Sequence, residues 1–183
     1  MLIFLYNKLK KNDFFTLNLN STFIMASKRI MLEYKELLKD PNCLFSIEIN
    51  SDSLFQWNFF IFGPEDTLYE GGIFPGKIIF PKDYPNSPPQ VKFDIDMKHP
   101  NIYRNGNVCI SILHSGSDQY GYENDNERWS PTQGVNSIML SIISLLSAPN
   151  FESPANVDMS TLQKNNYEEY KKMIFSLVSI TQN

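Results

Sequence analysis

Hydrophobic positions along the chain change their spacing several times, and each change predicts a different kind of element. The first regular stretch covers residues 26–39, where Ile30, Tyr34, Leu37 and Leu38 recur at helical spacing. Asp40, Pro41 and Asn42 follow directly and are unfavourable for continuing a helix. The pattern therefore predicts an amphipathic helix at the beginning of the folded domain.

Four runs with the character of β-strands come next. They are rich in β-branched and aromatic residues, and the first alternates apolar and polar positions; they cover residues 44–49, 55–62, 73–80 and 91–95. Gly63-Pro64 and Gly71-Gly72 supply turns between them. We therefore expect an antiparallel meander of four strands.

Helical spacing returns in the last third of the chain. Apolar residues recur from Val135 to Leu146, and Ser130 with Pro131 is typical of a helix N-cap followed by proline at the first helical position. A last helix is expected over roughly residues 165–179. The order of helix, four strands, a long irregular section and C-terminal helices predicts a segregated α+β fold.

Length and composition suit a single domain. The chain has 183 residues, of which 42% are hydrophobic, and no apolar run is long enough for a transmembrane segment. Residues 25–183 are expected to form the domain, and residues 1–24 a poorly ordered extension. In this extension the apolar residues precede the lysines, which is the wrong order for a secretory signal. A short helix on a membrane surface is the alternative interpretation.

Charge and cysteine content narrow the possible partners and the compartment. The net charge of −4 is too mild to indicate nucleic acid as a partner. Cys43 and Cys109 are 66 positions apart without a CxxC pair, so a reducing compartment, the cytosol or the nucleus, is expected. Two charge clusters stand out, and they are either solvated faces or docking surfaces. The basic one holds Lys28, Arg29, Lys35 and Lys39; the acidic one holds Asp118, Glu123, Asp125 and Glu127.

Cys109 is the main candidate for chemistry. It lies in an irregular segment between the fourth strand and the following helix. A lone cysteine with apolar neighbours is more often a small buried hydrophobic residue than a nucleophile. However, loops on a rigid scaffold are where reactive groups are usually displayed, and the long loops of this chain surround Cys109 in sequence.

The two histidines do not make a convincing catalytic pair with this thiol. His99 lies in a His-Pro-Asn turn, which is expected to tie it to the backbone, and His114 begins the acidic segment and receives no assigned role. The cysteines and histidines lack the paired short spacings of a zinc site, so no metal is expected. The glycines do not match a phosphate-binding loop, so no nucleotide cofactor is expected.

Acyl exchange between thioesters asks less of a site than hydrolysis. It needs a modestly activated thiolate and oriented dipoles but no strong base, since the entering and leaving thiols are equivalent. We therefore expect the sulfur of Cys109 to be reachable by solvent and to react without an imidazole beside it. Asn101 could either stabilise an oxyanion or hold the loop in shape.

Several motifs, taken together, resemble the core of the ubiquitin-conjugating enzymes, from about residue 25 to the end. They are Gly63-Pro64, Tyr69 to Gly72, Phe80 to Pro89, His99-Pro100-Asn101, Cys109 and Trp129-Ser130-Pro131. The resemblance implies that Cys109 accepts ubiquitin from an activating enzyme and passes it, with a RING-type ligase, to a lysine. ATP is used by the activating enzyme, so no cofactor is implied for this chain.

The resemblance also assigns roles to other positions. Asn101 would support attack on the thioester, with His99, Pro100 and Trp129 as supporting residues. The face shared by activating enzyme and ligase would comprise the first helix, the loop of residues 80–89 and residues 129–132. Its candidate residues are Lys28, Arg29, Asn86, Pro88, Ser130 and Pro131. Asn86 stands where many members carry a bulky apolar residue, so the choice of ligase would differ.

An insertion indicates the subgroup. Cys109 and Trp129 are 20 positions apart, and the inserted residues 114–128 resemble those of the G-type conjugating enzymes. That subgroup builds polyubiquitin chains for degradation, in several cases at the endoplasmic reticulum, which implies a cytoplasmic location. Ser153 stands where many members carry an acid that helps the lysine lose its proton, so the insertion, with Asp118 and Glu123 as supporting residues, would take over that role. Glu152 and Asp158 are the other acids nearby in sequence.

We hypothesise that the loop of residues 118–127 lies over Cys109 and guides the acceptor lysine by charge, the alternative being a disordered surface loop. Two rival functions are weighed. One is a non-catalytic ubiquitin-binding scaffold, which usually lacks the cysteine. The other is a conjugating enzyme for a related modifier.

Overall fold

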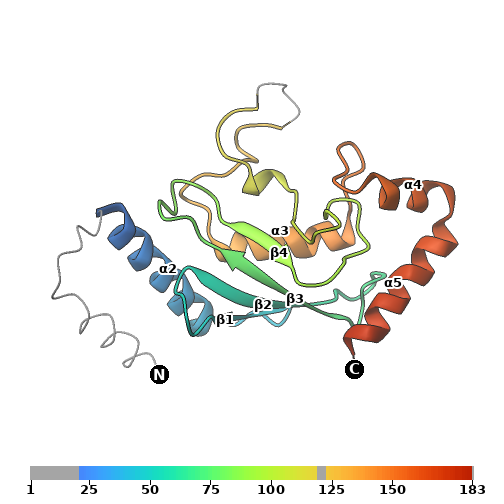
Figure 1. Cartoon of the computed structure of the whole chain (residues 1–183), viewed down its shortest axis with the longest axis horizontal. Coiled ribbons are helices and arrows are strands. Elements are labelled where there is room, and N and C mark those ends of the chain that lie inside the picture. Colours follow the sequence, from blue (N-terminus) through green and yellow to red (C-terminus); the bar gives the residue numbers. More distant parts are fainter. Residues whose placement is uncertain (1–20, 119–122, 183) are drawn as a thin grey trace.

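The computed structural model describes residues 21–118 and 123–182. Its elements follow the predicted order of a helix, four strands and C-terminal helices (Figure 1). They are α2 (Ser21–Lys39), β1 (Phe45–Ile49), β2 (Gln56–Phe62), β3 (Ile73–Ile79), β4 (Gln90–Phe93), the 3-10 turn η1 (Ser111–Leu113), α3 (Val135–Ser147), α4 (Val157–Asn165) and α5 (Tyr167–Thr181). The predicted α+β architecture is confirmed.

The four strands form one antiparallel sheet in the order β1-β2-β3-β4, so the predicted meander is also confirmed. Phe59 on β2 lies opposite Gly76 on β3, which in turn lies opposite Phe93 on β4. A Cβ at Gly76 would lie only 2.3 Å from the ring of Phe59. Glycine at this position therefore lets the ring of Phe59 reach Phe93, with ring centroids 5.3 Å apart.

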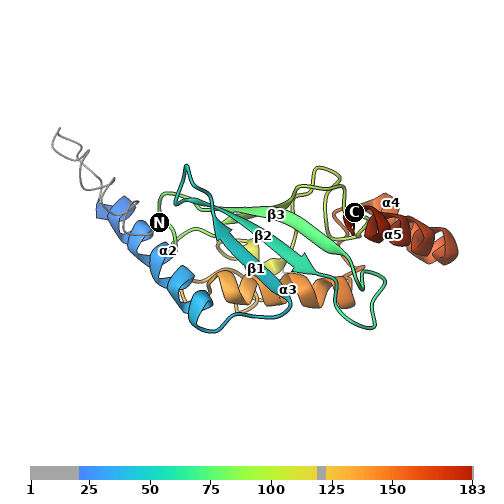
Figure 2. The ribbon, with the colours of Figure 1, turned by 90° about the horizontal axis from the view of Figure 1, so that it is seen from below.

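The core lies between one face of the sheet and α3, which runs along that face (Figure 2). Alternate residues of β2 and β3 point into this layer, as the two-residue period of a strand requires. The core residues include Trp57, Phe59, Ile61, Phe74 and Ile78 of the sheet and Ile138, Met139 and Ile142 of α3. The protein is thus built from two packed layers.

Helices stand at both ends of this core. α2 lies at one end, and α4 and α5 lie at the other (Figures 1 and 2). α5 is attached through Tyr170, which is 2% exposed and whose hydroxyl lies 3.4 Å from that of Tyr69. α4 was not predicted, because it is short and only Ser160 is fully buried, so its sequence shows little periodicity.

Two helix boundaries differ from the prediction. α2 begins at Ser21, five residues earlier than expected, and residues 1–20 of the predicted extension lie outside the described residues. α3 begins at Val135 and not directly after Ser130. Residues 130–133 form a turn instead, in which the N–H of Gln133 donates to the carbonyl of Ser130 at 2.9 Å. The N-cap of α3 is Gly134, whose N–H donates to the hydroxyl of Ser137 at 3.1 Å.

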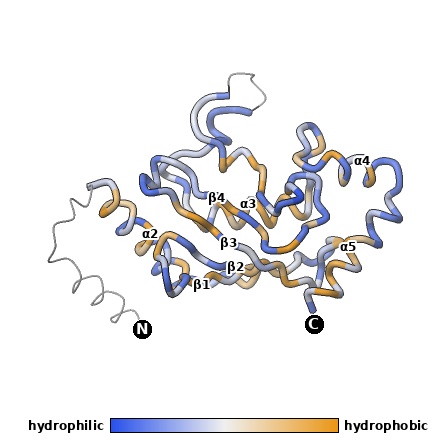
Figure 3. The backbone as a smooth tube through the Cα atoms, viewed as in Figure 1, coloured by the Kyte–Doolittle hydropathy of each residue, from blue (hydrophilic) through white to orange (hydrophobic). Residues whose placement is uncertain are grey.

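Hydropathy follows the same architecture. Figure 3 shows that α3 is mostly hydrophobic, whereas the segment that rises between η1 and α3 is mostly hydrophilic. Among the described residues, no helix combines the length and the apolar character needed to cross a membrane.

Candidate active site

The backbone at Cys109 and at the residue before it is held by hydrogen bonds to two other segments. The N–H of Cys109 donates to the carbonyl of Asn101 at 3.0 Å, and the N–H of Val108 donates to the carbonyl of Val91 at 3.0 Å. The side chain of Cys109 is half-buried and lines a groove of about 480 Å³. The expectation of a sulfur within reach of solvent is therefore confirmed.

Two polar side chains flank the sulfur of Cys109. The hydroxyl of Tyr103 donates to it at 3.9 Å, and Nε2 of His114 lies 3.9 Å from it. The charge of Cys109, followed by this hydrogen bond and by burial, raises the pKa of Tyr103. The prediction that no imidazole lies beside the thiol was wrong, because the 3-10 turn η1 brings His114 back to Cys109. The N–H of His114 donates to the carbonyl of Ser111 at 2.8 Å in this turn.

His114 is itself held by the insertion. Its Nδ1 lies 2.9 and 3.0 Å from the two carboxylate oxygens of Glu123. Glu123 forms an ion pair with Arg128, and the main-chain N–H of Glu123 donates to a carboxylate oxygen of Asp118 at 3.0 Å. The Nε of Arg128 also donates to the carbonyl of Gly116 at 2.6 Å, so the two described ends of the insertion are joined.

Two acidic side chains of the insertion line the groove that holds Cys109. Glu123 and Glu127 line this groove together with Ser153, and Asp118 and Glu152 line an adjoining one. Residues 119–122 of the hypothesised lysine-guiding loop lie outside the described residues. The described acids thus line the groove of Cys109 or the one beside it, and their guiding role stays a prediction.

Asn101 is 2% exposed and connects two loops. Its side-chain nitrogen donates to the carbonyl of Asn150 at 2.7 Å, and its side-chain oxygen accepts the N–H of Asn150 at 2.9 Å. Of the two roles considered, this geometry favours that of holding the loop. The bond to Asn150 uses one of the two amide hydrogens, so stabilisation of an oxyanion would require the other.

His99 is fully buried and bonded to backbone on both sides. Its Nδ1 accepts the N–H of Asn101 at 3.0 Å, so Nε2 carries the hydrogen and donates to the carbonyl of Leu145 at 3.0 Å. Burial lowers the pKa of His99 to about 4, although the bond to Leu145 acts in the opposite direction. The expected turn histidine is confirmed. The neighbouring Pro100 accepts the N–H of Asn156 through its carbonyl at 2.7 Å.

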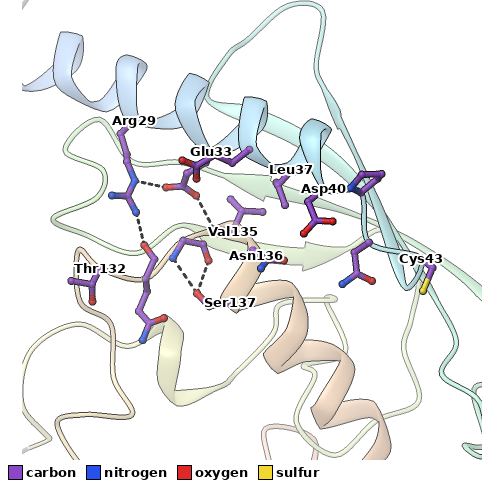
Figure 4. A pocket seen from close by; sticks show the side chains of 14 residues that line it. Arg29, Glu33, Leu37, Asp40, Cys43, Thr132, Val135, Asn136 and Ser137 are labelled. Carbon is purple, nitrogen blue, oxygen red and sulfur yellow. Dashed lines mark hydrogen bonds and ion pairs between the residues drawn. The ribbon is translucent and has the colours of Figure 1, made fainter.

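A buried carboxylate joins α2 to the loop of residues 80–89 and to the start of α3. Glu33 of α2 is 7% exposed. Figure 4 shows its carboxylate beside Arg29, with which it forms an ion pair, and beside Val135, whose N–H it accepts at 2.8 Å. The same carboxylate accepts the hydroxyl of Tyr84 at 2.6 Å. Burial, followed by the charge of Glu33, raises the pKa of Tyr84 far above its usual range. For Arg29, burial lowers the pKa, but the contacts with Glu33 outweigh it and the pKa is raised. Trp129 adds a link, since its ring N–H donates to the carbonyl of Pro85 at 2.8 Å.

The remaining residues predicted for this face differ in exposure. Lys28, Asn86 and Pro131 are exposed, whereas Pro88 and Ser130 are half-buried. The side chain of Arg29 is held by contacts within the domain, because it also donates to the carbonyl of Gln133 at 2.9 Å. Sequence reasoning missed Glu33, for which the four-residue spacing to Arg29 was the available signal.

Within the described ranges, no three His, Cys, Asp or Glu side chains are grouped as a metal site would require. Cys109, His114 and Glu123 form a chain of contacts and not a common coordination sphere. The absence of a bound metal or cofactor stays a prediction. What the arrangement offers chemically is an accessible thiol between a hydroxyl donor and an imidazole.

Comparisons with known proteins agree with this picture. The family model described as "Ubiquitin-conjugating enzyme" matches residues 29–178. The chain is 48% identical over 155 residues to ubiquitin-conjugating enzyme E2 G2 of Homo sapiens, covering 84% of this chain and 94% of that protein. It is 49% identical over 156 residues to ubiquitin-conjugating enzyme E2 15 of Schizosaccharomyces pombe, covering 84% and 93%. It is 49% identical over 159 residues to ubiquitin-conjugating enzyme E2 7 of Arabidopsis thaliana, covering 86% and 96%.

Proposed function

We propose that this chain, which belongs to the ubiquitin-conjugating enzyme family, carries ubiquitin as a thioester on the sulfur of Cys109. Membership of the family makes it a transferase of ubiquitination of the G-type kind, working with ubiquitin, an activating enzyme and a ligase. The observation that carries the assignment to Cys109 is the position of its sulfur, half-buried in a groove and on a backbone fixed to Asn101 and to β4.

Charging is an exchange between two thioesters. The sulfur of Cys109 attacks the carbonyl carbon of ubiquitin on the activating enzyme, a new C–S bond forms and the old C–S bond breaks. The proton of the Cys109 thiol ends on the departing thiol of the activating enzyme. Because the two thioesters are close in energy, the site needs to position the reactants more than to drive the reaction.

Transfer to a lysine consumes the thioester. The lysine nitrogen attacks the same carbonyl carbon, an amide bond forms and the C–S bond breaks. One proton of the lysine nitrogen ends on the sulfur of Cys109. We assign Asn101 to holding the loop of residues 149–152 beside the sulfur, since its amide bonds both main-chain groups of Asn150. The carboxylates of Glu123 and Glu127 would attract the cationic side chain of the incoming lysine along the groove.

We further propose that the enzyme, with a RING-type ligase, builds polyubiquitin chains for degradation at the cytosolic face of the endoplasmic reticulum, to which a partner recruits it. The support is the resemblance to the G-type subgroup. ATP would be used by the activating enzyme and no cofactor would bind here. Cell fractionation of a tagged chain tests the location.

The decisive test is a charging assay with activating enzyme, ATP and ubiquitin. The unmodified protein should gain one ubiquitin that thiol reductants remove. Cys109→Ser should gain an ester that thiol reductants leave intact, and Cys109→Ala should gain nothing. Cys43→Ser, which changes the other and exposed cysteine, is the matched control and should charge normally. Charging of Cys109→Ala would refute the assignment.

The guiding role of the insertion is tested by deleting residues 116–127. This deletion leaves Cys109 and His114 in place. If the acids guide the acceptor lysine, charging should persist while the growth of free polyubiquitin chains slows. Unchanged chain growth would refute the guiding role.

A further inference from the structure

The hydrogen-bonding pattern defines which nitrogen of His114 carries the proton. Nδ1 lies 2.9 and 3.0 Å from the oxygens of Glu123, a carboxylate that is ion-paired with Arg128. An ionised carboxylate only accepts hydrogen bonds, so Nδ1 must be the donor. In the neutral imidazole the other nitrogen then has a free lone pair. That nitrogen, Nε2, is the one 3.9 Å from the sulfur of Cys109.

Glu123, which bonds the imidazole of His114, is itself held in place by Arg128. The side chains of Glu123 and Arg128 are 21% and 13% exposed, so their ion pair is partly shielded from water. Arg128 is further fixed by its bonds to the carbonyls of Ser115 at 3.1 Å and Gly116 at 2.6 Å. A thiol, an imidazole and an orienting carboxylate in series form the arrangement in which an imidazole removes the proton from a nucleophile.

We propose that His114 is the proton acceptor of this site, with Glu123 and Arg128 as positioning residues. The inference rests on the proposed thioester function of Cys109 and deepens it. During charging, Nε2 takes the thiol proton as the sulfur of Cys109 attacks, and the resulting imidazolium returns the proton to the departing thiolate of the activating enzyme. His114 thus ends the step neutral.

The same nitrogen can serve the transfer step. When the neutral lysine amine adds to the thioester carbon, its nitrogen becomes cationic. Nε2 takes one of its protons, the C–N bond is kept and the C–S bond breaks. The imidazolium then protonates the leaving thiolate of Cys109. Ser153, which lines the same groove, has no side chain that accepts a proton readily, whereas His114 on another loop of that groove does.

Other charged and titratable groups border the imidazole and the sulfur. They are Tyr103, Asp118, Glu123, Glu127, Arg128 and Glu152. The carboxylates favour the imidazolium that forms during each step, and Arg128 opposes it. The hydroxyl of Tyr103 donates to the sulfur and so stabilises the thiolate once its proton has moved to His114.

The first test needs no ubiquitin. In a Cys43→Ser background, which removes the exposed second thiol, the rate of alkylation of Cys109 by iodoacetamide is measured from pH 5.5 to 9.5. His114→Gln should slow alkylation at pH 7 by at least about tenfold, and Glu123→Gln by a smaller factor, because general-base assistance typically contributes about 10²–10⁴-fold. Asp125→Asn removes a charge from the same insertion without any side-chain contact to His114 and should have no effect.

The second test follows a single discharge of preformed thioester to free lysine between pH 5.5 and 9. The unmodified enzyme should show a bend in the dependence of this rate on pH, because the proton acceptor must be unprotonated. His114→Gln should lose the bend and react about 10- to 100-fold more slowly at pH 7.5. A merely structural role of His114 would lower the rate at every pH and keep the bend, which would overturn the proposal.

The two tests separate the inference from the proposed function. If Cys109 never accepts ubiquitin, the thioester function fails while the alkylation experiment still reports on His114. If charging is normal and His114→Gln matches the unmodified protein in both tests, the inference alone fails. Should His114→Gln not fold, Glu123→Gln carries the test, since it keeps the imidazole and removes the charge that orients it.

Discussion

The carboxylate of Glu33 accepts the main-chain N–H of Val135 at 2.8 Å, although 102 positions separate the two residues. An anion at this place satisfies one of the free N–H groups at the start of α3 and interacts favourably with the helix dipole. Because the same carboxylate also bonds Tyr84 and Arg29, it fixes α2, the loop of residues 80–89 and α3 relative to one another.

Replacement of Glu33 by alanine should be strongly destabilising. It leaves the buried hydroxyl of Tyr84 and the N–H of Val135 without their acceptor, so we expect a loss of about 2–4 kcal/mol in the free energy of unfolding. Glu36→Ala, at an exposed position of the same helix, should change it by less than about 0.5 kcal/mol. Urea denaturation measures both, and equal losses would contradict the role given to Glu33.

Stability should depend on pH through His99. Its pKa is about 4 in the folded protein against an ordinary value of 6.5, so between these values the unfolded chain binds the extra proton. The contribution of His99 to the free energy of unfolding is therefore fully present above about pH 6.5 and decreases as the pH drops towards 4. Below pH 4 it changes no further, and the whole loss is roughly 3 kcal/mol.

Comparison with His99→Gln isolates this contribution, since glutamine does not titrate. Its urea-denaturation free energy should fall less steeply between pH 6.5 and 4 than that of the unmodified protein. Parallel curves would show that His99 is not the group responsible.

Asn101→Asp tests the bridge to Asn150. Aspartate keeps the acceptor for the N–H of Asn150 but loses the donor to its carbonyl, so we expect a loss of about 1–3 kcal/mol in stability. Charging of Cys109 should persist, while discharge to free lysine slows. Asn136→Asp, at an exposed position of α3, is the matched control for stability, and a similar loss there would argue against the bridge.

Arg128→Ala should open the insertion. The arginine joins Glu123 to the carbonyls of Ser115 and Gly116, and without it we expect limited proteolysis within residues 115–127 to become about tenfold faster, the factor that ~1.4 kcal/mol produces. Arg104→Ala breaks an ion pair with Asp158 whose side chains are 76% and 63% exposed, and it should leave this cleavage unchanged. Equal cleavage of the unmodified protein and both variants would contradict the role of Arg128 in holding the insertion closed.

The parts of the fold that follow from local sequence were predictable. The strands show their burial as alternation, and the turn at His99 follows from its proline and asparagine neighbours, so both were found within one or two residues of their observed places. The start of α3 was not, because its acceptor Glu33 comes from a distant segment. Only the tertiary structure brings these two residues together.

The same distinction applies to the site. Cys109 and Asn101 were recognised through their motifs, but the imidazole beside the sulfur was not. His114 reaches Cys109 because a short 3-10 turn reverses the chain, and it is oriented by Glu123, nine positions further on. Neither the turn nor the pairing has a strong signature in composition or periodicity.

The N–H of Trp129 donates to the carbonyl of His114 at 2.9 Å, so the two ends of the insertion lie side by side where it joins the domain. A loop whose ends are adjacent can change in length or sequence without moving the rest of the domain. Each doubling of its length costs only about 0.6 kcal/mol of closure entropy. The length and the net charge of the insertion can therefore evolve to suit new acceptors while the sheet and α3 stay unchanged.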